Sequence, residues 1–277
     1  MDLAGVLASF DAQLRRRARA GSGGWVEVEA QLVRVVEPGG WSGVVWSDLD
    51  PLGADADADA AIAGAGADAA IAEQVARFRA LGEPWEWKWY SYDRPPDLPQ
   101  RLVAAGLVAD PMETVLVAQI ADLDLTSRPP AGVELVPVVD EAGVLGLAGL
   151  HDAVFGGDHR AVGAAVLAGL AAAPRQVQAV LALVDGLPAS GGRVDFHAGT
   201  DFASLWGGGT LPAHRGRGLF RSLVAHRAAL ARDRGFRYLQ VDASSDSKPI
   251  LQRLGFVELA TTRPYRAERL RRGTLVT

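Results

Sequence analysis

The chain has 277 residues, 49% of them hydrophobic, and a formal net charge of −5. This length allows one large or two smaller domains, and the absence of cysteine excludes disulfides, thiolate metal sites and cysteine nucleophiles. The five histidines lack metal-ligand spacing, the negative charge disfavours nucleic acid, and no apolar run approaches the ~18 residues of a membrane span. We therefore expect a cytoplasmic protein without a metal centre that binds neither nucleic acid nor a membrane.

Apolar spacing and turn residues predict the elements of the first half of the chain. We expect a helix at residues 2–20 and a hairpin of two strands at 25–36 and 41–49. The low-complexity Ala/Asp tract at 54–70 is interpreted as a mobile loop before a helix at 71–81. The alternative is that the end of this tract joins that helix.

A strictly alternating segment, residues 85–92, places Trp85, Trp87 and Trp89 on one face of a strand. We expect this face to lie in the core of a sheet, and a wall for stacking a ligand is the alternative. A helix at 98–107 and a strand at 113–120 follow.

Strands and helices also alternate in the second half. The predicted elements up to the glycine-rich stretch are strand 133–138, helices 140–154 and 160–172, and strands 177–184, 187–197 and 201–211. Asp185 and Gly186 supply the turn between the second and third of these strands.

Residues 207–221 form a glycine-spaced basic loop between a predicted strand and a predicted helix. Gly216 and Gly218 let the backbone approach an anion closely. The helix that begins near Arg217 points unpaired N–H groups and the positive end of its dipole at the same place. Arg215 and Arg221 add positive charge. The stretch therefore predicts a pyrophosphate site.

Two other kinds of phosphate loop fit this stretch less well. A P-loop requires a Lys-Ser/Thr pair after its glycines, and none follows here. A dinucleotide-binding fingerprint requires a third glycine, and Leu219-Phe220-Arg221 stands there instead.

The pattern Arg215-x-x-Gly218, preceded by Thr210-Leu-Pro212, resembles the acetyl-CoA pyrophosphate loop of the GNAT N-acetyltransferase superfamily. The following elements are similar to that family's core as well. They are a helix at 219–234 closed by Gly235, a strand at 238–243 and a short helix at 247–254 that ends at Gly255-Phe256. The resemblance covers residues 132–268 and is most specific from the loop onward.

This resemblance implies an α/β (α+β) fold with a mixed, mostly antiparallel sheet flanked by helices, and acetyl-CoA as the cofactor. The residues that it implies for CoA binding are Thr210, Leu211, Arg215, Gly216, Arg217, Gly218, Leu219, Phe220, Arg221, Ser244 and Ser247. The two early helices of the second half and their connecting loop would shape the acceptor pocket, with His151, Asp152, Asp158 and His159 as substrate contacts. Three positions depart from the family pattern. Phe220 stands where Gly or Ala is usual, Ser244 stands where an Asn is often found, and Leu251 stands where a tyrosine commonly protonates the leaving thiolate.

The order of elements repeats between the two halves of the chain. For example, Gln100-Arg-Leu-Val-Ala-Ala-Gly-Leu-Val108 is similar to Gln252-Arg-Leu-Gly-Phe-Val257. We interpret the chain as two tandem GNAT-like domains: residues 1–122 as a degenerate domain, 123–131 as a linker and 132–277 as the catalytic domain. In the first domain Asp55, Asp57 and Asp59 occupy the place of the phosphate loop, where their charge would repel phosphate. An unrelated α+β domain is the alternative.

Acyl transfer to an amine requires a base for the amine, a donor to the thioester carbonyl and a proton for the departing thiolate. The family uses a bulged strand as the carbonyl donor. Here that strand is 204–211, and its three glycines supply no base. Asp195 and His197, which alternate on one strand, are the candidate bases, and Tyr265, in an expected last hairpin, is the candidate acid. Surface and packing roles are the alternatives.

We therefore expect an acetyl-CoA-dependent N-acetyltransferase in which the amine of a small molecule attacks directly. An antibiotic or a biosynthetic intermediate is the expected kind of acceptor, and the protein is expected to be a monomer or homodimer. A non-catalytic CoA-binding protein and an acyl-CoA enzyme of other chemistry, such as malonyl-CoA decarboxylation, are the alternatives.

Overall fold

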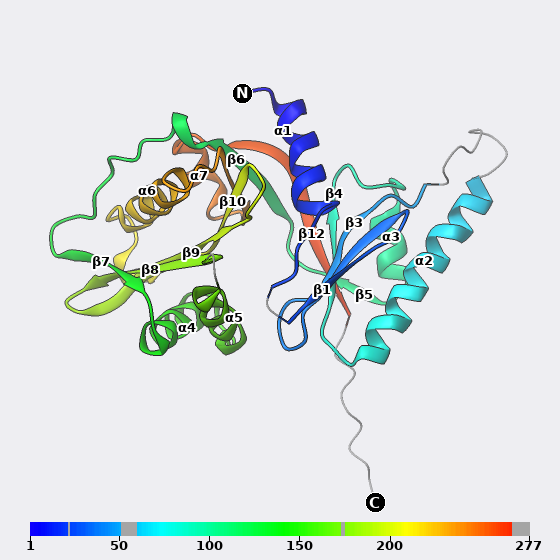
Figure 1. Cartoon of the computed structure of the whole chain (residues 1–277), viewed down its shortest axis with the longest axis horizontal. Coiled ribbons are helices and arrows are strands. Elements are labelled where there is room, and N and C mark those ends of the chain that lie inside the picture. The colour runs from blue at the N-terminus through cyan, green and yellow to red at the C-terminus, as the bar shows by residue number, and fades with distance from the viewer. Residues whose placement is uncertain (22, 51–59, 173–174, 268–277) are drawn as a thin grey trace, which may run out of the picture. The chain divides into compact units, whose positions relative to one another are not determined.

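The computed structural model describes residues 1–21, 23–50, 60–172 and 175–267 (Figure 1). The contacts within it define two compact units, neither of which is contiguous in sequence. Unit 1 comprises Met1–Leu14 and Thr114–Leu259, and unit 2 comprises Arg15–Glu113 and the segment from Ala260 onward. Each unit therefore combines segments from both halves of the chain.

Unit 1 contains six strands in the order β6-β11-β10-β9-β8-β7. Their bounds are β6 Glu113–Gln119, β7 Val133–Val138, β8 Val177–Val184, β9 Leu187–Phe196, β10 Phe202–Thr210 and β11 Tyr238–Ala243. β10 and β11 are parallel, and every other neighbouring pair is antiparallel. The expected mixed, mostly antiparallel sheet is confirmed.

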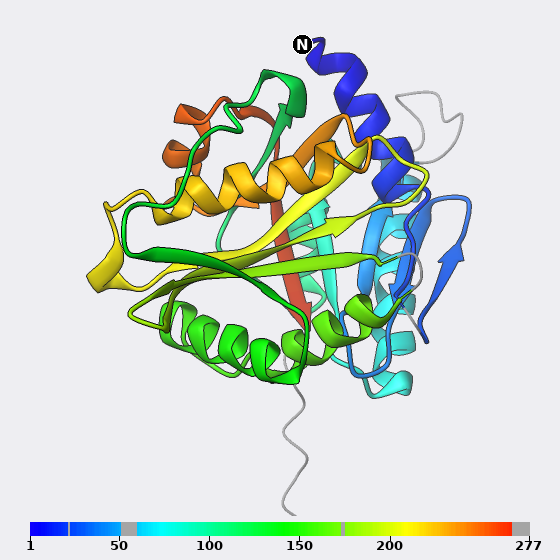
Figure 2. The ribbon, with the colours of Figure 1, turned by 60° about the vertical axis from the view of Figure 1, so that its left-hand side comes forward.

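Helices pack on both faces of this sheet (Figure 2). On one face, α4 (Glu141–Phe155) and α5 (Arg160–Ala171) share a core with β7 and β8 that includes Leu147 and Val166. On the other face, α6 (Leu219–Arg232) packs through Val224 and Ala228. The side chain of Asp140 accepts from the backbone N–H of Gly143 and so starts α4 where the sequence predicts. The helices α1 (Leu3–Phe10) and α7 (Lys248–Arg253) also belong to unit 1.

Unit 2 contains strands in the order β1-β2-β3-β4-β12, and β5 pairs with β12. Their bounds are β1 Trp25–Val28, β2 Leu32–Val36, β3 Gly43–Ser47, β4 Glu86–Tyr90, β5 Leu107–Ala109 and β12 Val257–Ala267, and the helices are α2 Ala60–Leu81 and α3 Leu98–Ala104. The single strand predicted at 25–36 is instead a hairpin, because the chain reverses where the N–H of Glu29 donates to the carbonyl of Leu32. Helix α2 begins at Ala60, so the end of the low-complexity tract does join the helix. Asp55, Asp57 and Asp59 lie outside the described residues.

The alternating tryptophans lie in the core of unit 2. Trp87 is fully buried, and Trp85 stacks on Phe78 with ring centroids 4.5 Å apart. Trp89 packs against the same cluster while partly exposed. The expectation of a core face is confirmed, and the ligand-stacking alternative is not needed.

The two halves of the chain exchange strands. β6 comes from the first half and pairs with β11, whereas β12 follows α7 and pairs with β4. Arg263 and Pro264 continue β12 opposite Trp89 and Lys88, so the hairpin turn expected before Tyr265 is wrong. The predicted limits of separate domains at residues 122 and 132 stay a prediction.

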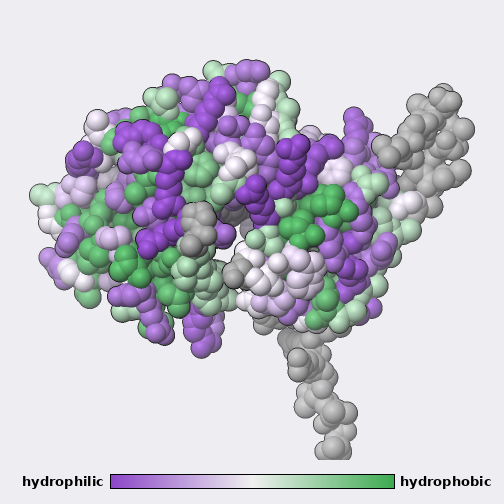
Figure 3. Space-filling model, viewed as in Figure 1, coloured by the Kyte–Doolittle hydropathy of each residue, from purple (hydrophilic) through white to green (hydrophobic). Residues whose placement is uncertain are grey.

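Two classes of feature are missing from the described part of the chain. No helix there is long and apolar enough to cross a bilayer, and no group of three His, Asp or Glu side chains there is arranged to hold a metal ion. Polar side chains are interspersed with apolar ones over the face seen in Figure 3.

Candidate functional site

Strands β10 and β11 separate in the middle of the unit 1 sheet. Their parallel pairing covers only Phe202–Ser204 and Tyr238–Gln240, although β10 continues to Thr210 and β11 to Ala243. Beyond Ser204, the edge of β10 that faces away from β9 therefore carries backbone N–H and C=O groups that β11 does not pair. Such groups need a partner.

β10 also contains a bulge within this separated stretch. Trp206 pairs with Arg193 and Gly209 with Gly191, so Gly207 and Gly208 together stand opposite the single residue Gly192. Gly207 has a φ of 59°, as in bulges whose first residue is a left-handed glycine.

The predicted phosphate loop follows β10 directly and leads into α6. Gly216 and Gly218 have φ of 74° and 86°, and Gly218 is the N-cap residue of α6. No acidic residue stands in the first turn of this helix, and residues 215–218 are exposed. The first N–H groups of α6 therefore face solvent in the manner of an anion site.

Local hydrogen bonds position the arginines of the loop. The Nε of Arg215 donates to the carbonyl of Thr210 at 3.2 Å, and an Nη of Arg217 donates to Nδ1 of His214 at 2.9 Å.

Since β10 and β11 run parallel, their C-terminal ends lie at the same end of the sheet. Ser244 follows β11 there, with its Oγ 3.2 Å from that of Ser247. The predicted CoA-binding residues thus lie at or after the C-terminal ends of these two neighbouring strands.

Phe220, one of the departures from the family pattern, lies in the first turn of α6 and packs against the core. A Cβ on Gly208 would lie 3.0 Å from the Phe220 ring. The glycine in β10 therefore makes room for the large side chain that replaces the usual small residue, and the ring does not fill the loop.

A row of polar side chains crosses the sheet where β10 and β11 separate. Nε2 of His197 lies 2.8 Å from Oγ of Ser204. This hydroxyl donates to Oε1 of Gln240 at 2.8 Å. Nε2 of Gln240 in turn donates to Asp242 at 2.7 Å. Because the carboxyl oxygen of Asp242 accepts this bond, the amide nitrogen of Gln240 faces Asp242 and the amide oxygen faces Ser204. Ser204 therefore donates to Gln240 and accepts from the Nε2–H of His197.

Asp195 lies beside this row, because on β9 it pairs with Ser204 of β10. It forms an ion pair with Arg193 at 3.0 Å. Sequence reasoning found Asp195 and His197 but missed Ser204 and Gln240, which are polar side chains in the middle of buried strands. That unusual position is the signal that could have found them.

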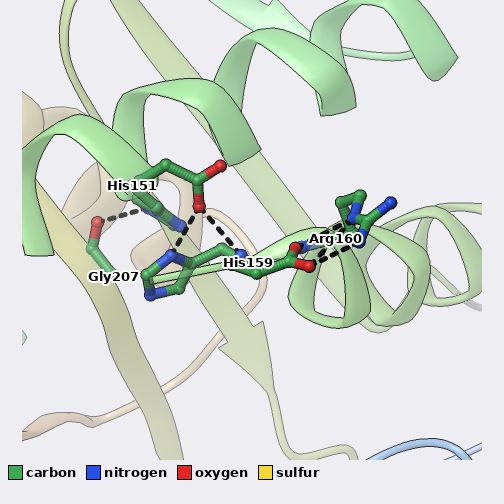
Figure 4. A network of polar contacts seen from close by, with 6 residues as sticks. His151, His159, Arg160 and Gly207 are labelled. Atoms are coloured by element: carbon green, nitrogen blue, oxygen red, sulfur yellow. Dashed lines mark hydrogen bonds and ion pairs between the residues drawn. The ribbon is translucent and has the colours of Figure 1, made fainter. Parts of the chain in front are cut away.

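The four predicted substrate contacts at the end of α4 differ in their surroundings (Figure 4). His151 is 1% exposed, and its Nε2 lies 2.8 Å from the carbonyl oxygen of Gly207. Burial lowers the pKa of His151, so the neutral ring donates from Nε2. Asp152 accepts from His159 at 2.9 Å, and Asp158 pairs with Arg160. That hydrogen bond to Arg160 lowers the pKa of Asp158 to about 2.

Tyr265 belongs to unit 2, whereas β10 and β11 belong to unit 1. It is 2% exposed in the core of unit 2, and on β12 it pairs with Trp87 and Ala109. Packing among the apolar side chains of this core favours a packing role for Tyr265 over the predicted role of general acid.

Unit 2 contains a second parallel strand pair, β3 and β4, which pairs only over Gly43–Val44 and Glu86–Trp87. Beyond this pairing, the Nε of Arg15 donates to the carbonyl of Val45 at 3.0 Å, and its Nη2 donates to both carboxylate oxygens of Asp93 at 2.7 and 2.8 Å. The guanidinium also lies 3.9 Å from the centroid of the Tyr90 ring. A buried side chain thus occupies the place that is open in unit 1.

Solved structures with a similar fold match almost the full chain. A GCN5-related N-acetyltransferase from Kribbella flavida matches with a TM-score of 0.68 and 20% identity over 96% of each chain. A tandem GNAT protein from the clavulanic acid biosynthesis pathway matches with a TM-score of 0.56 and 15% identity over 96% of this chain and 93% of its own. A GCN5-related N-acetyltransferase from Sphaerobacter thermophilus matches with a TM-score of 0.58 and 13% identity, over 87% of this chain and 81% of its own. No protein-family model and no curated protein matches the sequence.

The first two of these likenesses extend over both compact units of the chain. At such low sequence identity they concern the fold rather than the substrate. The chain has the fold of the GCN5-related N-acetyltransferases.

Proposed function

We propose that the protein is an acetyl-CoA-dependent N-acetyltransferase whose acceptor is the amine of a small molecule. One observation carries the proposal: the anion-binding loop before α6 and the unpaired, bulged stretch of β10 are consecutive parts of one chain segment. A loop alone suits many phosphates. An open strand edge beside it suits a long arm with amide groups, such as that of CoA, because the arm can pair with the backbone.

The loop fits a pyrophosphate on three grounds. Its backbone is exposed at Gly216 and Gly218, the first turn of α6 holds no carboxylate, and Arg215 and Arg217 stand beside it. Exposed N–H groups and guanidinium groups are the donors that phosphate oxygens accept from.

In the proposed reaction the neutral amine attacks the thioester carbonyl, a C–N bond forms and the C–S bond breaks. The negative charge that develops on the carbonyl oxygen requires a fixed donor, and the backbone N–H groups of β10 near the bulge would supply it. The nitrogen loses a proton to a base, and the thiolate takes up a proton from solvent or a nearby group. No covalent intermediate with the protein is needed.

The polar row on the sheet supplies the candidate bases, Asp195 and His197. Asp195 forms an ion pair with Arg193, and the row that ends at Asp242 orients the ring of His197. Rate profiles over pH for Asp195→Asn and His197→Phe separate the two, because only loss of the true base removes its own titration from the low-pH limb of kcat/KM.

The loop after α4 supports a cationic acceptor. Asp158 belongs to it and pairs with Arg160, and Asp152 lies in the last turn of α4 beside it and accepts from His159. The low pKa of Asp158 keeps its carboxylate charged at neutral pH. Opposite charge raises the local concentration of an ammonium substrate.

The test has two stages. Thermal melting is compared with CoA, acetyl-CoA and ATP, since a ligand at 100 times its dissociation constant stabilises by about 2.7 kcal/mol. A shift with the CoA species alone supports the site, and no shift refutes it.

Amines are then screened with acetyl-CoA, and free thiol and acetamide are both measured. Thiol with acetamide supports the proposal, thiol without acetamide indicates other acyl-CoA chemistry, and binding without turnover of any amine indicates a CoA-binding protein.

A further inference from the structure

The glycines of β10 contact helices on both faces of the sheet. A Cβ on Gly207 would lie 2.6 Å from the His151 ring, and a Cβ on Gly209 would lie 2.9 Å from Val154, both on α4. On the opposite face, a Cβ on Gly208 would lie 3.5 Å from a guanidinium nitrogen of Arg227 on α6. Both helices therefore pack against bare backbone at the bulge.

His151 bonds to the bulge from the α4 side. Its ring is 1% exposed, and Nε2 lies 2.8 Å from the carbonyl oxygen of Gly207. A carbonyl oxygen only accepts, so the proton of the neutral ring is on Nε2. This bond sets the direction of the Gly207–Gly208 peptide, and with it the direction of the Gly208 N–H.

Arg227 bonds to the neighbouring strand from the α6 side. It is 1% exposed, and it donates to the carbonyls of Leu223 and Arg193, each at 3.1 Å. Gly192, the residue opposite the bulge, lies so close that a Cβ there would be 2.6 Å from Nη1. Burial lowers the pKa of Arg227 to about 10, so the side chain still carries its charge at neutral pH.

A bulge made of glycines needs such support. Glycine backbone has more accessible conformations than any other, and an error of ~1 Å in the position of a catalytic group can cost about 10²-fold in rate. A buried guanidinium is also costly to keep in an apolar core, so its position beneath the bulge calls for a role.

We propose that His151 and Arg227 are positioning residues, which hold the Gly207–Gly208 bulge from opposite faces of the sheet in the shape that directs backbone N–H groups at the acyl carbonyl. The inference rests on the proposed function for its catalytic meaning. It assigns to His151 a role other than substrate contact, and it gives Arg227 a role that no charge pattern of the sequence predicts.

The experiment compares His151→Phe, which keeps a ring but removes the donor, with His151→Gln, which keeps an N–H at similar reach. Arg227→Met and Arg227→Lys form the second pair. His226→Phe and Arg232→Met on α6 are the matched controls, since neither side chain is among the atoms nearest to a Cβ placed on the bulge glycines. Each protein is labelled with [15N]glycine for NMR, and its Kd for CoA and its kcat and KM are measured.

We expect His151→Phe and Arg227→Met to shift the amide resonances of residues 207–209, to lower kcat by ~10²-fold, and to leave the Kd for CoA within a few-fold of wild type. His151→Gln and Arg227→Lys should recover most of the loss. Unchanged resonances in His151→Phe and Arg227→Met overturn the inference, as does an equal loss in the matched controls. If His151→Phe or Arg227→Met does not fold, the corresponding variant, His151→Gln or Arg227→Lys, takes its place. Amide resonances of residues 207–209 identical to those of wild type, together with full kcat, then support the inference. Loss of these resonance positions at full kcat overturns it.

The two proposals fail separately. If wild-type protein neither binds CoA nor forms acetamide, the proposed function is wrong, and the NMR comparison still decides whether the two side chains set the bulge.

Discussion

Gly218 shows how much of this site depends on single residues. Its φ of 86° starts α6 with exposed N–H groups, a conformation that glycine adopts without cost. The same is true of Gly207 in the bulge, whose φ is 59°. Sequence spacing predicted Gly216 and Gly218 as a phosphate site, because spacing within one loop is local. It did not predict His151 as the partner of Gly207, because 56 residues separate them.

Gly218→Glu is expected to abolish CoA binding, since it places a carboxylate where the pyrophosphate would sit. Gly218→Ala is the control. It carries the same left-handed strain of about 1–2 kcal/mol without the charge. Calorimetric titration with CoA should show loss of binding in the Glu variant and retained binding in the Ala variant. Equal affinity in the Glu variant and wild type would remove the loop from the site.

Tyr265→Phe is expected to leave turnover close to wild type. The phenol is buried in unit 2, and loss of a true general acid would lower the rate by about 10²-fold or more. The measurement is kcat with acetyl-CoA and the best amine found. A loss of that size would restore Tyr265 as the acid.

His151 should make stability depend on pH. Burial, then nearby His159 and Arg193, lower its folded pKa below the ordinary 6.5, against the Gly207 carbonyl and Asp152, which favour the cation. The unfolded chain therefore takes up a proton first as pH falls below about 6.5, and the free energy of unfolding decreases from there toward the folded pKa. Urea unfolding between pH 7.5 and 5.5 should show a weaker decrease in His151→Phe than in wild type. The same slope in both would show that His151 does not titrate in this way.

Among the helices and strands, those with clear apolar periodicity match their predicted ranges best. β7, β8 and β11 have the predicted bounds, α4 is displaced by one residue at each end, and α5 ends one residue early. The errors fall where a turn lacks strong turn residues, as in the reversal between β1 and β2, or where a proline continues a strand, as in β12. Local pattern decides an element when one face is buried continuously.

In unit 2 the side chain of Arg15, rather than a ligand, occupies the place beyond the pairing of the parallel strands β3 and β4. Arg15→Ala should destabilise the protein by about 3–5 kcal/mol, because it leaves the buried carboxylate of Asp93 without its counter-ion. Urea unfolding measures the loss. The double variant Arg15→Met/Asp93→Asn should recover part of it, since Asn still accepts from the N–H of Tyr90 and carries no charge. No recovery would mean that shape rather than charge makes Arg15 necessary.

At the scale of the whole molecule, the two halves of the sequence exchange the strands β6 and β12. Each compact unit needs a strand from the other half of the sequence. Residues 1–122 and 132–277, expressed separately, should therefore fail to melt cooperatively, because each lacks a strand and exposes a sheet edge. Full-length protein cleaved at a protease site inserted at residues 123–131 is the control and should keep its melting transition. Cooperative melting of either half alone would support two autonomous tandem domains.

The loop before α6, the order of elements and the core face of the tryptophans were readable from the chain alone, since each depends on residues close together in sequence. Three features required the folded chain: the exchange of strands, the burial of Tyr265 in unit 2, and the meeting of His151, Arg227 and the glycines of β10. The physical reason is the same for all three. Alternation and turn chemistry act over a few residues, whereas strand pairing and close packing join residues that no local pattern relates.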